Sequence, residues 1–185
     1  MGKKYKTEEM KKVIKAAQGL EKADIVLKNA RYLNVFTNEF MDGDIAVSGG
    51  YIAGTGKYSG KTEIDMAGRY VVPGFIDAHM HIESSIITPA EYAKAVIPHG
   101  TSVIVADPHE IANVLGCAGI DYMMAMSKKL PLDVYFMMSS CVPATMFDES
   151  GEKITHKEVK KYLKNKRVLG LAEMMNYPGV ISCDD

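Results

Sequence analysis

The sequence lacks several features that would place it in a specialised class of protein. Its 185 residues include only three cysteines, Cys117, Cys141 and Cys183, which are widely separated and contain no C-x-x-C pair. This spacing predicts neither a zinc knuckle nor a redox motif, and it favours a reducing, cytoplasmic location. No apolar run approaches the roughly 20 residues needed to span a bilayer, so we expect no membrane partner.

The sequence also has no large excess of positive or negative charge. The formal net charge is -1, with 22 basic and 23 acidic residues, so the chain offers no basic surface for a polyanion and we expect no nucleic-acid partner. What is present is ordinary for a globular protein, because 47% of the residues are apolar and 24% are charged. A chain of this length can bury a substantial core.

Residues 1–68 have the pattern of a helix followed by a small β module. Thr7 followed by Glu8 and Glu9 is a typical helix start, and the apolar residues that follow recur on one face until Gly19. Strand-like segments then follow one another at residues 25–27, 32–36, 44–47 and 51–53. We interpret this part as an N-terminal helix and a small antiparallel β-sandwich portion.

Residues 69–185 instead alternate between strands and helices. Apolar strands are expected at 70–78, 101–106, 133–138 and 167–172. Helices are expected after Thr88-Pro89, around 119–129, and after Thr155 with Glu158 as the partner of the cap. Such alternation predicts an α/β fold with parallel strands, namely the first half of a (β/α)8 TIM-type barrel. Since a complete barrel has eight strands, we expect the chain to be an incomplete barrel that further sequence or another chain completes.

The most informative motif is His79-Met80-His81 at the end of the first barrel strand. Residues two apart in a strand project to the same side, so both imidazoles can reach one cation. The alternative is two histidines on an exposed strand face. Because the pair follows an apolar run and precedes a polar turn, where barrel enzymes place their reactive groups, we predict metal ligands.

Glu173 occupies the corresponding position after the fourth strand. A carboxylate there can bridge two divalent cations opposite the two imidazoles. The alternative interpretation of Glu173 is a carboxylate at a helix start or a salt-bridge partner. Its place at a strand end leads us to predict a metal ligand that also takes part in catalysis.

The remaining candidates lie in the same set of loops. Asp107 and Glu110 fit a helix N-cap and its N3 partner, with Pro108 at N1. His109 can contact substrate, bind an accessory metal or play a structural part. Ser140 is interpreted as part of the pocket lining.

Glu83, two residues after His81, is the second catalytic candidate. Its carboxylate can orient a ligand imidazole or reach the substrate. We favour the orienting role.

These motifs resemble those of the adenine deaminase family in the amidohydrolase superfamily. The strand that ends in His79 and His81 resembles the superfamily's entry motif. Four further phrases resemble adenine deaminases in particular, at residues 81–85, 106–114, 140–144 and 172–180. Relatives that open cyclic amides generally carry a carboxylated lysine at the end of the fourth strand, where this chain has Glu173.

The resemblance implies hydrolytic deamination of adenine to hypoxanthine and ammonia. It implies a binuclear divalent centre of manganese or iron rather than zinc, held partly by His79, His81 and Glu173, and we expect the intact enzyme to be a homo-oligomer. In the family, further metal-ligating histidines and an aspartate that takes the proton from the attacking hydroxide lie in strands five to eight. These strands are not part of the 185 residues, so we expect little turnover by this chain. The alternatives are an amidohydrolase that acts on a cyclic amide or N-acyl substrate, and a non-catalytic fragment.

Overall fold

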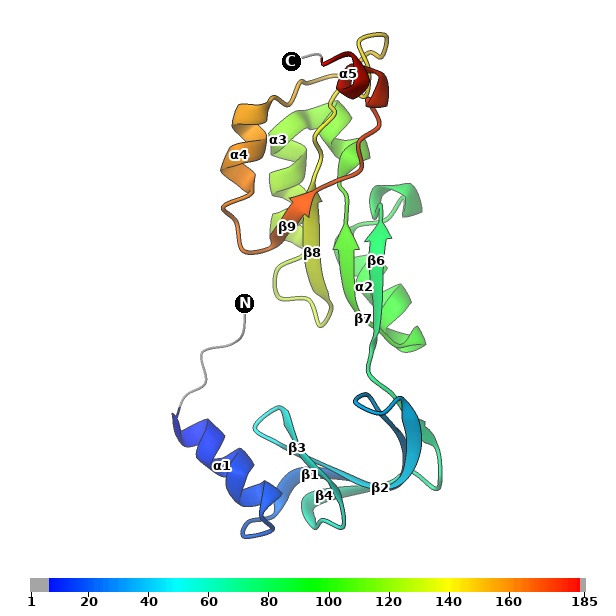
Figure 1. Ribbon diagram of the computed structural model, residues 1–185, viewed down its shortest axis with the longest axis vertical. Coiled ribbons are helices and arrows are strands. Elements are labelled where there is room, and N and C mark those ends of the chain that lie inside the picture. Colours follow the sequence, from blue (N-terminus) through cyan, green and yellow to red (C-terminus); the bar gives the residue numbers. More distant parts are fainter. Residues whose placement is uncertain (1–6, 184–185) are drawn as a thin grey trace. The chain divides into compact units, whose positions relative to one another are not determined.

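The computed structural model describes residues 7–183. The chain divides into two compact units between Pro73 and Gly74 (Figure 1). Each unit has its own sheet, and each is described separately below.

The first unit consists of one helix and one five-stranded sheet in which β3, β2, β1 and β4 lie in that order. Its elements are α1 (Thr7–Ala17), β1 (Ala23–Asn34), β2 (Glu39–Ser48), β3 (Tyr51–Gly56), β4 (Gly60–Asp65) and β5 (Tyr70–Val71). The predicted antiparallel arrangement holds for the pairs β1–β2 and β2–β3. It is wrong for β4 and β5, which both run parallel to β1.

The segments 25–27 and 32–36 were expected to be separate strands, but most of their residues belong to the single long strand β1. The register of β1 against β2 shifts between Leu27 and Ala30, and Asn29 there has a φ of 53°. This bulge carries the strand through a stretch where the apolar pattern is interrupted. A small core, in which Ala16 of α1 packs with residues of β1 and β2, holds the helix on the sheet.

The second unit is a four-stranded parallel sheet in the order β6-β7-β8-β9. Its strands are β6 (Phe75–Met80), β7 (Thr101–Ala106), β8 (Asp133–Met138) and β9 (Val168–Leu171). Its helices are η1 (Glu83–Ser85), α2 (Pro89–Val96), η2 (Ile97–His99), α3 (His109–Met126), α4 (His156–Tyr162) and α5 (Tyr177–Ser182). The β/α alternation predicted for a partial (β/α)8-type barrel is therefore confirmed.

Two helix starts follow the sequence signals closely. The Thr88 hydroxyl accepts a hydrogen bond from the Glu91 backbone N–H, and Pro89 occupies the first turn. Thr155 and Glu158 form a reciprocal capping box at the start of α4. Both arrangements satisfy backbone donors that would otherwise lack partners at a helix N-terminus.

The strand expected at 70–78 is in fact two strands. Tyr70–Val71 pairs with β1 in the first sheet, and β6 begins only at Phe75. Pro73 between them lacks a backbone N–H and cannot extend a ladder. The Phe75 backbone N–H instead donates to the Gly100 carbonyl at 2.8 Å, which starts the second sheet.

The third helix differs from its prediction. It begins at His109, well before the expected 119–129, and Gly116 interrupts it with φ 55° and ψ -136°. The predicted cap by Asp107 is also wrong. Pro108 occupies the N-cap position instead of the predicted N1 and makes no side-chain hydrogen bond. The Asp107 carboxylate lies next to Ser139 and His109.

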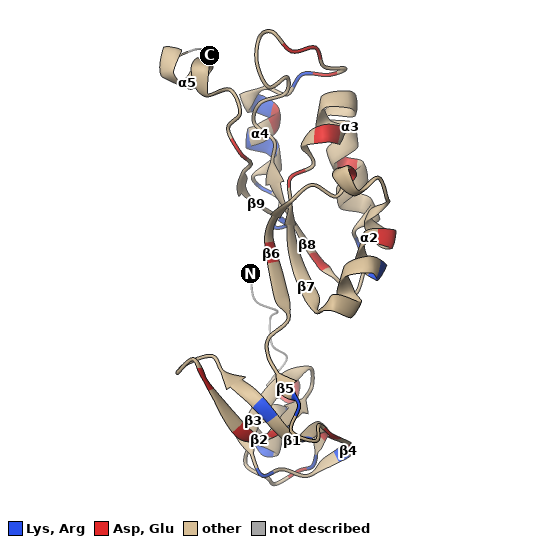
Figure 2. Ribbon diagram, turned by 90° about the vertical axis from the view of Figure 1, so that its right-hand side faces the viewer, with Lys and Arg blue, Asp and Glu red and all other residues tan. Residues whose placement is uncertain are grey.

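The core of the second unit lies between the sheet and its helices, with Ile104, Phe136 and Ile120 among its fully buried members. Figure 2 shows α2 and α3 along one face of the sheet.

Within residues 7–183, no helix is both long enough and apolar enough to cross a membrane.

Candidate metal centre

The positions of His79 and His81 are fixed by the pairing of β6 with β7. Met80 lies opposite Ala106, and the Asp107 backbone N–H donates to the Met80 carbonyl at 2.9 Å. The end of the first barrel strand is therefore tied to its neighbour at Met80, between the two histidines.

Glu173 follows β9, and its backbone is held by the loop after β8. The Ala172 backbone N–H donates to the Met138 carbonyl at 2.9 Å. The Cys141 thiol lies 3.5 Å from the Glu173 carbonyl oxygen, and the Met175 backbone N–H lies 3.3 Å from the Cys141 sulfur. A buried cysteine thus holds the segment that carries the carboxylate.

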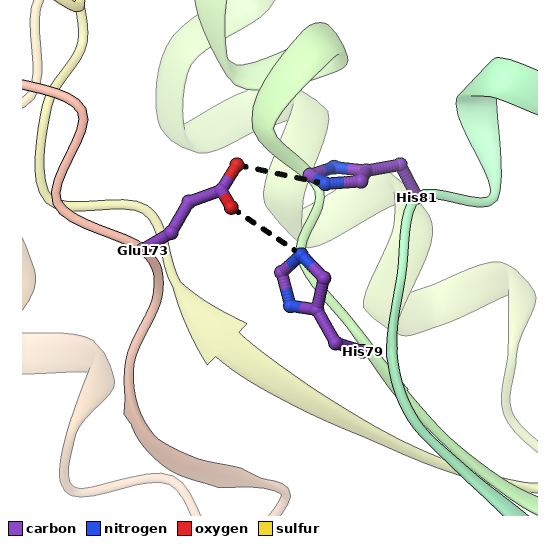
Figure 3. Close-up of side chains that lie close together, drawn as sticks. All are labelled: His79, His81 and Glu173. Carbon is purple, nitrogen blue, oxygen red and sulfur yellow. Dashed lines mark ion pairs between the residues drawn. The ribbon is translucent and has the colours of Figure 1, made fainter.

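The three side chains converge (Figure 3). His79 Nε2 lies 3.4 Å from Glu173 Oε2, and His81 Nε2 lies 3.7 Å from Glu173 Oε1. The two imidazole rings are nearly perpendicular, with their centroids 5.0 Å apart. All three side chains remain accessible to solvent, with exposed fractions of 47%, 22% and 44% for His79, His81 and Glu173.

This spacing fits a shared cation. The two nitrogen-oxygen distances exceed the 2.7–3.2 Å typical of hydrogen bonds. Around a tetrahedral ion with bonds of about 2.1 Å, neighbouring ligand atoms lie about 3.4 Å apart. One candidate ligand atom from each of the three side chains lies within 4.8 Å of the others. Neutral imidazole nitrogens and a carboxylate are donors that divalent transition metals accept.

Asp107 and His109 form a buried network beside this centre. Asp107 accepts a hydrogen bond from the Ser139 hydroxyl at 2.8 Å, and its other oxygen lies 3.3 Å from His109 Nδ1. His109 Nε2 lies 2.9 Å from the Cys141 carbonyl oxygen. The bond to Asp107, supported by the Cys141 carbonyl and opposed by burial, raises the pKa of His109 to about 9.

This network bears on the role of His109. Asp107, His109 and Glu173 also have potential ligand atoms within 4.8 Å of one another. However, an imidazolium that donates through both nitrogens has no lone pair for a metal. The Asp107–His109 pair is therefore a charged, hydrogen-bonded pair that stabilises the ends of β7 and β8.

The other two candidates, Glu83 and Ser140, are not members of the group of converging ligand atoms. Glu83 Oε1 accepts a hydrogen bond from the Ile111 backbone N–H at 3.4 Å, and its buried Oε2 has no hydrogen-bond partner among the described residues. Burial raises the pKa of the Glu83 carboxyl. The Ser140 hydroxyl is likewise buried without a partner in the described part of the chain, and Ser140 lines a cavity of about 680 Å³ beside α4.

Sequence reasoning missed two residues that contact this region. Glu110 Oε2, and not Glu83, lies 3.1 Å from His81 Nδ1. Ser139, which the sequence analysis did not single out, binds Asp107. The available signal was only their presence in loops behind strand ends, because pairings with residues distant in sequence leave no local pattern.

The fold and these side chains define the class of protein. Residues 70–185 match the Amidohydrolase family, and the chain belongs to that family.

Among its relatives are proteins named adenine deaminase. The chain is 55% identical over 172 residues to the adenine deaminase of Clostridium acetobutylicum, which covers 93% of this chain and 30% of that protein. It is 54% identical over 173 residues to adenine deaminase 2 of Carboxydothermus hydrogenoformans, which covers 94% of this chain and again 30% of the relative. The chain therefore spans about 30% of the length of these curated relatives.

Solved structures agree on the fold. An L-hydantoinase from Arthrobacter aurescens superposes with a TM-score of 0.58 at 17% identity, over 80% of this chain and 32% of that one. An N-acyl-D-glutamate deacylase from Bordetella bronchiseptica, complexed with zinc and a phosphonate inhibitor, gives a TM-score of 0.55 at 15% identity, over 87% of this chain and 40% of that one. At these identities the similarity concerns the fold alone.

Proposed function

We propose that this chain contributes to the divalent-metal centre of an enzyme that hydrolyses adenine to hypoxanthine and ammonia. The observation that carries this proposal is the convergence of His79, His81 and Glu173 at the strand ends. The similarity to adenine deaminases at 50–55% identity supports the choice of substrate.

The three side chains would hold the metal, and we propose a binuclear centre of manganese or iron. When bound, such ions lower the pKa of a water molecule from about 15.7 toward neutrality. His79 and His81 would bind through Nε2, the nitrogen that each presents to Glu173. Glu173 has two oxygens directed to the two rings, which suits a bridging ligand.

The reaction replaces the exocyclic nitrogen of adenine with oxygen. Water adds at C6, the C–N bond breaks, and the nitrogen leaves as ammonia after it gains a proton. Glu83 has a buried carboxyl oxygen without a described partner, and we propose that it orients the metal site or contacts substrate. We propose that His109, whose ring nitrogens lie next to Asp107 and the Cys141 carbonyl, and Ser140 shape the substrate side of the site without a direct bond from the His109 ring.

We also propose that the enzyme serves purine salvage in the cytoplasm and assembles as a homo-oligomer. Cys117, Cys141 and Cys183 are all free thiols, which supports a reducing compartment.

A chimera would test the proposed activity. The matched segment of the Clostridium acetobutylicum adenine deaminase would be replaced by this chain, and ammonia release from adenine would be measured. We expect the chimera to be active and its His79→Ala variant to be inactive at equal folded content. A folded chimera that releases no ammonia from adenine, or that prefers a hydantoin, dihydroorotate or an N-acyl substrate, would contradict the proposal.

A further inference from the structure

His81 lies between two carboxylates, each of which is close to a different nitrogen of the imidazole ring. Glu173 Oε1 is 3.7 Å from Nε2, and Glu110 Oε2 is 3.1 Å from Nδ1. Nδ1 is buried and has no hydrogen-bond partner among the described residues, so Glu110 is an ion-pair neighbour within hydrogen-bond distance. The carboxylate that faces this nitrogen is Glu110, which nothing in the sequence motif assigns to the metal centre.

Glu110 is itself held in place. The Ser84 hydroxyl donates to Glu110 Oε1 at 2.6 Å, which leaves Oε2 for His81. Ser84 belongs to η1, which begins two residues after His81, and Glu110 lies in the first turn of α3. The contact thus links the loop after the first barrel strand to the helix after the second.

The chemical consequence concerns the proton of the neutral imidazole. A neutral ring carries one N–H, and the hydrogen bond of one nitrogen decides which nitrogen keeps a free lone pair. A carboxylate at Nδ1 keeps the proton there, so the Nε2 lone pair is available on the side of Glu173. Carboxylates that bind the second nitrogen of a metal-ligating histidine orient the ring and raise its basicity.

We propose that Glu110 is the positioning residue for His81 and fixes its Nδ1–H tautomer so that Nε2 faces the metal site. This inference rests on the metal-ligating role given to His81 above. His79 provides an internal comparison, since the ion pair described for His79 in residues 7–183 involves only Nε2.

The first test measures the tautomer directly. NMR of the metal-free 185-residue chain with 15N-labelled histidine, at a pH where His81 is neutral, reports which ring nitrogen carries the proton. We expect the Nδ1–H form in the wild type and a shift toward Nε2–H in Glu110→Ala, with His79 unchanged. Glu110→Gln keeps an acceptor oxygen and should restore the wild-type tautomer.

A matched control is Glu91→Ala. Glu91 also lies in the first turn of a helix, but it pairs with Lys94, so its removal should leave His81 unchanged. An Nε2–H tautomer in the wild type, or a tautomer unaffected by Glu110→Ala, would overturn the proposal.

The second test measures metal binding. Titration with Mn²⁺ or Zn²⁺ should show affinity about 10–100-fold weaker in Glu110→Ala than in the wild type, with a smaller loss in Glu110→Gln. Undiminished affinity in Glu110→Ala would contradict the positioning role. A tautomer that depends on Glu110 in a wild-type chain that binds no metal would support the positioning role and contradict the proposed metal centre.

Discussion

His109 Nδ1 lies 3.3 Å from Asp107 Oδ2 in the interior of the second unit, where both side chains are almost completely buried. This pair joins the end of β7 to the start of α3. The Ser139 hydroxyl adds the end of β8 to the same network.

The pair predicts a specific dependence of stability on pH. The pKa of His109 is raised from 6.5 to about 9, so its contribution is complete below about pH 6.5 and is lost as the pH rises through about 9. The ion pair therefore adds about 3 kcal/mol more to the free energy of unfolding below pH 6.5 than it does well above pH 9. Asp107→Asn should therefore lower the free energy of unfolding most at pH 6 and progressively less toward pH 9.5.

Urea unfolding across this pH range measures the effect. Ser139→Ala is the control, because it removes a hydroxyl that does not titrate in this range and keeps both members of the Asp107–His109 pair. It should lower stability by a similar amount at each pH. A wild-type and Asp107→Asn difference that stays constant from pH 6 to 9.5 would refute the charged-pair assignment.

Substitution of Arg167, which does not belong to the metal centre, should cause a large loss of stability. Its guanidinium donates to the backbone carbonyls of Val134 and Met124 and to the Ser127 hydroxyl. Burial lowers the pKa of Arg167. Arg167→Met would leave buried acceptors without donors and should cost about 3 kcal/mol in the free energy of unfolding. The exposed Lys166→Ala serves as the control in the same urea series, and equal effects of the two changes would count against this role.

Gly116 should not tolerate a side chain. Its φ of 55° lies in the left-handed region, and an added Cβ would lie 2.9 Å from Glu152 Cβ. Gly116→Ala should therefore lower the free energy of unfolding by about 2 kcal/mol. Gly68 also has a positive φ but nothing within 4 Å of an added Cβ, so Gly68→Ala should cost less. Thermal unfolding compares the two, and a neutral Gly116→Ala would show that the helix can adjust.

Local patterns sufficed where local forces decide the structure. The strands Thr101–Ala106 and Asp133–Met138 have the bounds expected from their apolar runs. The caps at Thr88 and Thr155 follow from hydroxyls placed before helical segments.

Expectations failed where a partner distant in sequence decides. Asp107 has the local pattern of a helix cap, yet its carboxylate binds Ser139 and His109 instead. The parallel pairing of β4 and β5 with β1 likewise depends on the return path of the chain. The Glu110 contact with His81 joins two loops that no single motif connects.

The most direct test of the account is the amount of divalent metal bound by the 185-residue chain. Equilibrium dialysis against Mn²⁺ or Zn²⁺, followed by elemental analysis, should show bound metal in the wild type. It should show loss of that metal in each of His79→Ala, His81→Ala and Glu173→Gln, while circular dichroism stays unchanged. Metal retained at the wild-type level in all three folded variants would contradict the claim that these side chains share a cation.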